Sequence, residues 1–183
     1  KKVYSGDLLD YEIIVSPDSP NDTPATAIAE RKSRITDYDY DANGRVIRQT
    51  DANGGVINFR YDPQGNRVLL QDPVGNITTW VYDSLNRVVE ERDPLYWDKL
   101  INHTPGSPLA GLTGDALLAA VVAYNQNPPS GADPDSNIGA EHVLVYDYDA
   151  EGNRSKTIDR NGRIRTFVYD HAGRLLDELW WQG

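Results

Sequence analysis

A tyrosine followed by an aspartate recurs along this 183-residue chain at a spacing of 21 residues, and this period constrains the fold more than any other feature. The spacing holds within two groups, one of three pairs and one of two. A self-similar period of this length is typical of repeat proteins, in which each unit is one supersecondary motif. The five pairs, whose tyrosines we call the signature tyrosines, are Tyr40 with Asp41, Tyr61 with Asp62, Tyr82 with Asp83, Tyr148 with Asp149, and Tyr169 with Asp170.

Each repeat also carries the residues of two tight turns. A glycine comes four residues after the tyrosine in four units, and the third unit has Asn86 there. A second aspartate comes eleven residues after the tyrosine in the first four units. Aspartate suits the first turn position because it caps a backbone N–H, and glycine suits the position that needs a positive φ. The glycines are Gly44, Gly65, Gly152 and Gly173, and the second aspartates are Asp51, Asp72, Asp93 and Asp159.

The segments between these turns are six or seven residues long, as in 66–71 and 76–82. At about 3.3 Å per residue, each segment spans roughly 20 Å, which is the length of an ordinary strand. Short strands that alternate regularly with turns indicate an antiparallel meander. We therefore predict an all-β fold of consecutive 21-residue β-hairpins, forming a curved sheet with open edges, with one short helical insertion.

The period breaks once, between Tyr82 and Tyr148, which are 66 residues apart instead of 21. The excess of 45 residues predicts an insertion with a short helix near 115–125, where an alanine- and leucine-rich stretch follows residues that can cap a helix. A loop packed on the sheet is favoured over a binding element. The chain then divides into an N-terminal strand and loop segment at 1–34, repeats one to three at 35–94, the insertion at 95–141, and repeats four and five at 142–183.

The charge balance argues against two classes of partner. Asp and Glu number 28 against 18 Lys and Arg, so the formal net charge is −10. Nucleic acids and anionic membrane surfaces both require clustered basic residues. No apolar run reaches the roughly 18 residues of a membrane-spanning helix. We expect no nucleic-acid partner and no membrane insertion, and the absence of methionine indicates a fragment of a longer protein.

Three kinds of chemical site would use the polar residues of this chain, and ordinary turn chemistry explains each set better. Asp39, Asp41 and Asn43 resemble the start of an EF-hand loop, but the twelfth loop position is Thr50 and not glutamate. The three histidines are isolated, without the spacing of a metal site. A glycosidase needs two facing carboxylates, whereas most aspartates here occupy turn positions. We expect no catalytic residue, no cofactor, no metal and no enzymatic activity.

Aromatic side chains are the strongest binding feature. An aromatic residue precedes each signature tyrosine by two positions, so these rings recur at equivalent places on the strands. Rings stacked across neighbouring strands would form a ladder, which binds sugars if it is exposed and packs the sheet if it is buried. Packing is favoured because one repeat cannot bury its face alone. The candidate ligand-contacting aromatics are Phe59, Trp80, Tyr146 and Phe167 in the repeats, and Trp97 outside them.

The motif Tyr-Asp-x-x-Gly-Arg, at 40–45 and 169–174, resembles that of the RHS/YD-repeat family. This family includes bacterial polymorphic toxins, toxin-complex shell proteins, wall-associated proteins and the teneurins of animals. The resemblance implies a β-sheet strip that coils into a hollow shell, which commonly encloses a C-terminal toxin or serves as a surface module. Some members are described as carbohydrate-binding. A full match to the family's self-cleaving segment is missing, so no autoproteolysis is expected.

The resemblance and the turn chemistry together give a functional expectation. The first is a non-enzymatic structural segment of a larger RHS/YD-repeat protein, part of a β-shell or surface scaffold associated with toxin carriage. The alternative is a cell-surface recognition module that binds carbohydrate or a partner protein, and the third is a polysaccharide-acting enzyme. The expected partners are further YD repeats or a toxin domain of the same protein, or a glycan or cell-surface protein. The expected location is secreted or at the bacterial cell surface.

Overall fold

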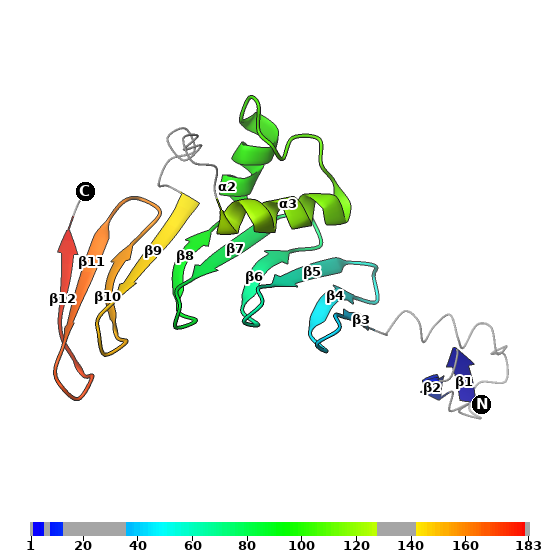
Figure 1. The fold of residues 1–183 in the computed structure, drawn as a ribbon, viewed down its shortest axis with the longest axis horizontal. Coiled ribbons are helices and arrows are strands. Elements are labelled where there is room, and N and C mark those ends of the chain that lie inside the picture. The colour runs from blue at the N-terminus through cyan, green and yellow to red at the C-terminus, as the bar shows by residue number, and fades with distance from the viewer. Residues whose placement is uncertain (1, 6–7, 13–35, 128–141, 182–183) are drawn as a thin grey trace.

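The computed structural model describes residues 2–5, 8–12, 36–127 and 142–181, and its main element is an open antiparallel sheet (Figure 1). Within these residues the sheet has ten strands in chain order, with β3 and β12 at its two edges, so the predicted meander is confirmed. The strands are β3 (Asp37–Tyr40), β4 (Val46–Thr50), β5 (Val56–Tyr61), β6 (Arg67–Gln71), β7 (Ile77–Tyr82), β8 (Val88–Arg92), β9 (Val143–Tyr148), β10 (Arg154–Ile158), β11 (Ile164–Tyr169) and β12 (Leu175–Trp181).

A separate antiparallel hairpin is formed near the N-terminus by β1 (Lys2–Ser5) and β2 (Leu8–Glu12). It lies in the segment where the sequence predicts strands. The loop predicted in the same segment lies outside the described residues.

The signature turns, which begin at the aspartate after each signature tyrosine, share one hydrogen-bond pattern. In the first of them Asp41 N donates to Arg45 O at 2.9 Å, and Gly44 N donates to Asp41 O at 3.0 Å. Gly44 has a φ of +76°, which is why glycine is favoured there. In the third repeat Asn86 takes this place with a φ of +60°, a conformation that asparagine tolerates better than most residues.

Each of the five hairpins contains one β-bulge opposite its signature tyrosine. In the first hairpin Tyr40 pairs with Val46 while Asp39 pairs with Arg48, so one residue of β4 is left over. The same shift recurs in the other four hairpins. A bulge bends the strand and increases the local twist. One bulge per repeat therefore distributes the curvature of the sheet evenly along the array.

The insertion between β8 and β9 forms a helical layer on one face of the sheet (Figure 1). Its described part contains α2 (Pro94–Asp98), the π-helical turn η1 (Lys99–His103) and α3 (Gly114–Gln126). The helix expected near 115–125 is α3. The insertion contains a further short helix, α2, which Asp93 caps by accepting a hydrogen bond from Tyr96 N at 3.0 Å.

The hydrophobic core lies between this helical layer and strands β6 and β7. Leu69 and Ile77 supply the sheet side, and both are almost fully buried. Outside this region the sheet residues are mostly half-buried or exposed. The helical side of the core consists of Tyr96, Trp97, Leu100, Leu109, Leu118, Val121 and Tyr124.

Candidate functional site

Each signature tyrosine after the first joins its own repeat to the preceding one. The hydroxyl of Tyr61 donates to Val46 O at 2.9 Å, a carbonyl 15 residues back in the previous hairpin. The other three signature tyrosines make the same bond at 2.8–3.0 Å. The tyrosine of the repeat is therefore an inter-repeat hydrogen-bond donor, a role that depends on strand register and that sequence spacing alone does not reveal.

The residue after the turn glycine makes a second inter-repeat contact where it is arginine. The Arg45 guanidinium lies over the Tyr61 ring, with 4.6 Å between the guanidinium carbon and the ring centroid. Arg87 lies over Tyr148 in the same way at 4.4 Å, across the insertion. Cation–π contacts of this kind hold a ring and a charge together at modest energy. In the second and fourth repeats the equivalent residue is asparagine, which is too short to cover the next ring.

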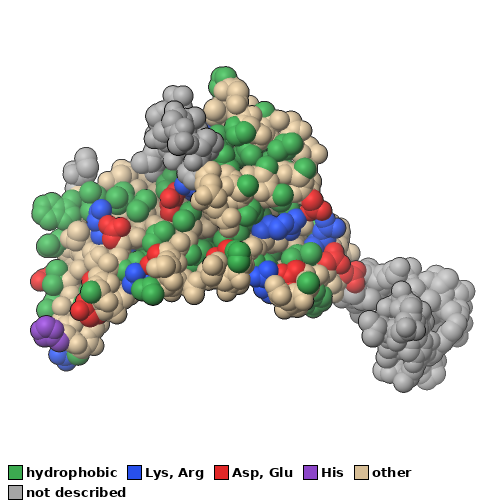
Figure 2. All heavy atoms as spheres, in the orientation of Figure 1, with side chains coloured by type: hydrophobic (Ala, Val, Ile, Leu, Met, Phe, Trp, Pro, Cys, Tyr) green, Lys and Arg blue, Asp and Glu red, His purple; other side chains and the backbone are tan. Residues whose placement is uncertain are grey.

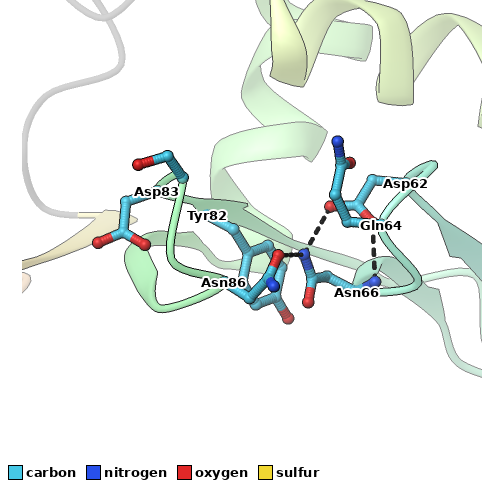
Figure 3. Close-up of a pocket in the computed structure, with 7 residues that line it drawn as sticks. Asp62, Gln64, Asn66, Tyr82, Asp83 and Asn86 are labelled. Carbon is cyan, nitrogen blue, oxygen red and sulfur yellow. Dashed lines mark hydrogen bonds between the residues drawn. The ribbon is translucent and has the colours of Figure 1, made fainter.

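A hollow of about 360 Å³ lies between the second and third signature turns (Figure 3). Asn66 crosses it, and its amide nitrogen donates to Asp62 Oδ2 and to Asn86 Oδ1, each at 2.8 Å. The lining is polar apart from one aromatic ring. The lining residues are Asp62, Gln64, Asn66, Tyr82, Asp83, Ser84 and Asn86.

The turn aspartates are bound by their own turns and are not poised for proton transfer. The pKa of Asp83 lies below its usual 3.8, first because the Arg87 backbone N–H donates to its carboxylate, and also because of the Arg87 side chain. The Arg87–Asp83 ion pair is 2.7 Å long. The pKa of Asp41 and of Asp170 is lowered for the same reasons. These carboxylates stay ionised at neutral pH and serve the turn.

The recurring aromatics lie on the sheet face opposite the helical layer, which we call the open face. The register places Arg60 beside Leu69 on the covered face, where Arg60 also contacts Asp115 of α3 at 2.7 Å. Phe59 and its partner Leu70 therefore point to the open face. The other candidate aromatics of the repeats, Trp80, Tyr146 and Phe167, lie on this face too and are half-buried.

The expectation that these rings stack across neighbouring strands is wrong. One period contains two strands, so a strand without a member of the set always intervenes. Trp80, for example, pairs with Glu91 on β8 and donates its indole N–H to Glu91 Oε2 at 3.0 Å. Cations partly fill the space between rings, because the Arg67 guanidinium lies 5.0 Å from the Trp80 ring centroid.

Trp97 is a core residue and offers no surface to a ligand. Its prediction as a ligand-contacting aromatic is therefore wrong. Only 1% of Trp97 is exposed. Its indole N–H donates to Thr79 Oγ1 at 3.2 Å, and its ring packs edge-on against Tyr96 and Tyr124 at 5.0 and 6.1 Å between centroids. The insertion does not follow the 21-residue period, so the sequence contains no pattern that predicts the burial of Trp97.

The insertion is closed at its base like an ordinary turn. Asp93 N donates to His142 O at 3.0 Å, the bond that Asp72 N makes to Asn76 O in the preceding repeat. Asp93 Oδ2 also lies 3.4 Å from His142 Nδ1 and 3.4 Å from Arg160 Nε. The 45 extra residues therefore leave the strand register of the array unchanged.

The described residues hold no group of three or more His, Asp or Glu side chains that could bind a metal ion. His103 is exposed and lies 3.4 Å from Asp98, while His142 belongs to the base of the insertion. Among the helices of the described part, none is long and apolar enough to cross a membrane.

The ten-strand meander and its repeated turns define a β-hairpin repeat protein, and a family model matches part of its sequence. Residues 40–77 and 145–178 match the family model described as RHS Repeat. These two segments are therefore similar to RHS repeats, and they contain both copies of the Tyr-Asp-x-x-Gly-Arg motif. No curated protein matches the sequence.

Some solved structures are similar to this chain at low sequence identity. One is the crystal structure of TcdB2-TccC3 without its hypervariable C-terminal region. This structure is 16% identical in sequence and covers 80% of this chain with a TM-score of 0.37. Another is the Tc holotoxin pore of Photorhabdus luminescens with a TccC3 mutation, which is 17% identical with a TM-score of 0.23 over 86% of this chain. The chain spans 8% and 9% of the length of these two proteins.

Proposed function

We propose that this chain is a non-enzymatic structural segment of a larger RHS/YD-repeat protein, in which it forms part of a β-shell or scaffold associated with toxin carriage. The observation that carries the proposal is the use of the signature residues. The Tyr hydroxyls bind the preceding repeat, and the Asp carboxylates bind their own turns. These bonds give the signature residues a structural role within the turns and between the repeats.

The exposed edge strand β12 supports an association with further repeats. Every residue of β12 is exposed, including Leu179, Trp180 and Trp181. Figure 2 shows hydrophobic side chains gathered at this end of the molecule. An exposed strand edge presents unpaired backbone N–H and C=O groups and is a template for pairing. The apolar side chains of β12 make burial against another strand favourable.

Hydrogen exchange of the edge strands tests this proposal. We expect the amides of β12 to exchange rapidly in the 183-residue chain and slowly in the full-length native protein, because neighbouring strands would then protect them. Strand β7 in the centre of the sheet is the internal control and should be protected in both. Equal exchange rates for β12 in the two proteins would contradict the assignment to a continuous shell.

The second candidate function is recognition of a glycan or partner protein at the surface of a bacterial cell, and the open face favours it. Trp80 and Tyr146 are half-buried there, with one face of the sheet left uncovered by the helical layer. Aromatic rings of this kind stack on sugars. A glycan array with the chain and its Trp80→Ala variant tests this function, and arrays without signal for the unaltered chain would reject it.

A further inference from the structure

The residue that follows the positive-φ position of each signature turn, which is glycine in four repeats and Asn86 in the third, is arginine in three repeats and asparagine in two. Arg45, Arg87 and Arg174 are the arginines, and Asn66 and Asn153 are the asparagines. The exposure of the next tyrosine follows this choice. The hydroxyl bonds of Tyr61 and Tyr148, which arginine covers, are part-buried, whereas those of Tyr82 and Tyr169 are exposed.

The Arg45 guanidinium is held by three groups at once. It lies 4.6 Å from the Tyr61 ring centroid, its Nε donates to Asp41 Oδ2 at 2.7 Å, and its Nη1 donates to Asp62 O at 3.1 Å. The set comprises an aromatic face, a carboxylate and a backbone carbonyl. A planar guanidinium with five N–H donors suits such a set better than any other side chain of a protein.

One repeat later the same three groups surround the hollow in Figure 3. A shift of 21 residues turns Tyr61, Asp41 and Asp62 into Tyr82, Asp62 and Asp83, and all three line the hollow. Among the described residues no guanidinium stacks on the Tyr82 ring. The array thus repeats the arginine-holding groups here while supplying only the short amide of Asn66.

We propose that this hollow binds the arginine side chain of a partner polypeptide. The guanidinium lies over the Tyr82 ring and donates to Asp62 Oδ2, which retains acceptor capacity beside its bond from Asn66. Gln64 and Ser84, whose side chains make no hydrogen bond within the described part, supply further polar contacts. The proposal is independent of whether the array belongs to a shell.

A peptide is the favoured source of the arginine because of the surface around the hollow. Leu85 projects from the third signature turn and is 68% exposed. An arginine held at the Tyr82 ring carries its methylene stem and its neighbouring residues along the turn row, where Leu85 offers an apolar contact. The net charge of −10 favours the approach of a basic segment.

The site is tested by NMR titration of the ¹⁵N-labelled 183-residue chain with the capped tripeptide Gly-Arg-Gly. We expect saturable shifts of the amides of Gln64, Ser84 and Asn86. The matching peptide with citrulline, which has the same shape without the charge, should bind about ten-fold more weakly. The Gly-Lys-Gly peptide should also bind more weakly, because an ammonium cannot match the planar fork.

Variants of the chain separate this site from general attraction of a cation to an acidic protein. Asn66→Arg supplies the guanidinium from within, so it should abolish the peptide-induced shifts and raise Tm. Asn153→Arg makes the same change at the other asparagine and should leave the shifts at Ser84 and Asn86 unchanged. Equal binding of the citrulline peptide, or binding that survives Asn66→Arg, would overturn the proposal.

Discussion

The two rows of turns at opposite ends of the strands have similar sequences but different surroundings. The signature turns contact one another, as Arg45 does when it donates to Asp62 O and Asn66 when it donates to Asn86. The turns at the other end, which begin at Asp51 and Asp72, bond mainly within themselves. The 45-residue insertion replaces a turn of the second row.

This difference explains why the extra sequence of this chain is accommodated in the second row. An insertion in the second row leaves the inter-repeat tyrosine bonds in place, and Tyr148 indeed donates to Val88 O at 2.8 Å across the insertion. An insertion in the signature row would separate residues that hold neighbouring hairpins together. The signature turns therefore lie at the end of the sheet where neighbouring hairpins bond to each other, and the insertion of this chain lies at the other end.

The largest expected effect comes from the core of the inserted layer. Trp97→Ala should lower the free energy of unfolding by about 3–5 kcal/mol, because it removes a fully buried indole and leaves a cavity. Urea unfolding measures this loss. Trp180→Ala, at a residue that is 61% exposed, is the control and should cost about 0.5 kcal/mol or less. If Trp97→Ala also changed the amide chemical shifts of the last signature turn, the two rows of turns would not be independent of each other.

A matched pair of loop insertions tests the comparison directly. A flexible Gly/Ser loop of about eight residues placed after Gln64 enters a signature turn, and the same loop after Val74 enters a second-row turn. The closure entropies are equal, so the first variant should be less stable by about 2 kcal/mol through the lost Asn66–Asn86 contact and the displaced Tyr82 bond. Equal Tm values for the two variants would remove the distinction between the rows.

The tyrosine hydroxyl bond is a smaller contribution that can be isolated. Tyr82→Phe keeps the ring and removes the donor to Arg67 O, so the free energy of unfolding should fall by about 1 kcal/mol. Tyr38→Phe, which alters an exposed ring on the edge strand, should change it far less. A loss of the same size in Tyr38→Phe would mean that the bond to the preceding repeat is not the cause.

The smallest effect expected is a dependence of stability on acid pH. The pKa of the Asp83 carboxyl in the folded chain is below its usual 3.8, so its ionised form is favoured by folding. This stabilisation is complete above about pH 4 and is lost as the pH falls through the folded value. Tm measured between pH 5 and pH 2 should therefore fall less steeply in Asp83→Asn than in the unaltered chain, and parallel curves would contradict the assignment.

The regular part of the fold could be predicted from the sequence because every repeat carries the same turn residues at nearly the same positions. Asp and Gly at fixed offsets determine the turns, and the turns determine the strands between them. Asn86 also fits this rule, since asparagine can adopt the positive φ that glycine adopts elsewhere. The all-β meander followed from these positions without any knowledge of long-range contacts.

The inserted layer could not be derived in this way. Helix α2 has five residues, too few for a helical periodicity to appear, although Asp93 before Pro94 is a typical N-terminal signal. The burial of Trp97 depends on Thr79 and Tyr124, which are distant in sequence. The hollow beside Tyr82 arises from the register between repeats, together with the choice of Asn66 over arginine.

The Tyr148 hydroxyl bond has a consequence for the order of folding. Its counterparts close segments of 15 residues, whereas it closes one of 60. Each doubling of a flexible loop adds about 0.6 kcal/mol of closure entropy, so the two doublings add about 1.2 kcal/mol. We therefore expect hairpins β3–β8 and β9–β12 to form first as two local units, and the pairing of β8 with β9 to join them later in folding.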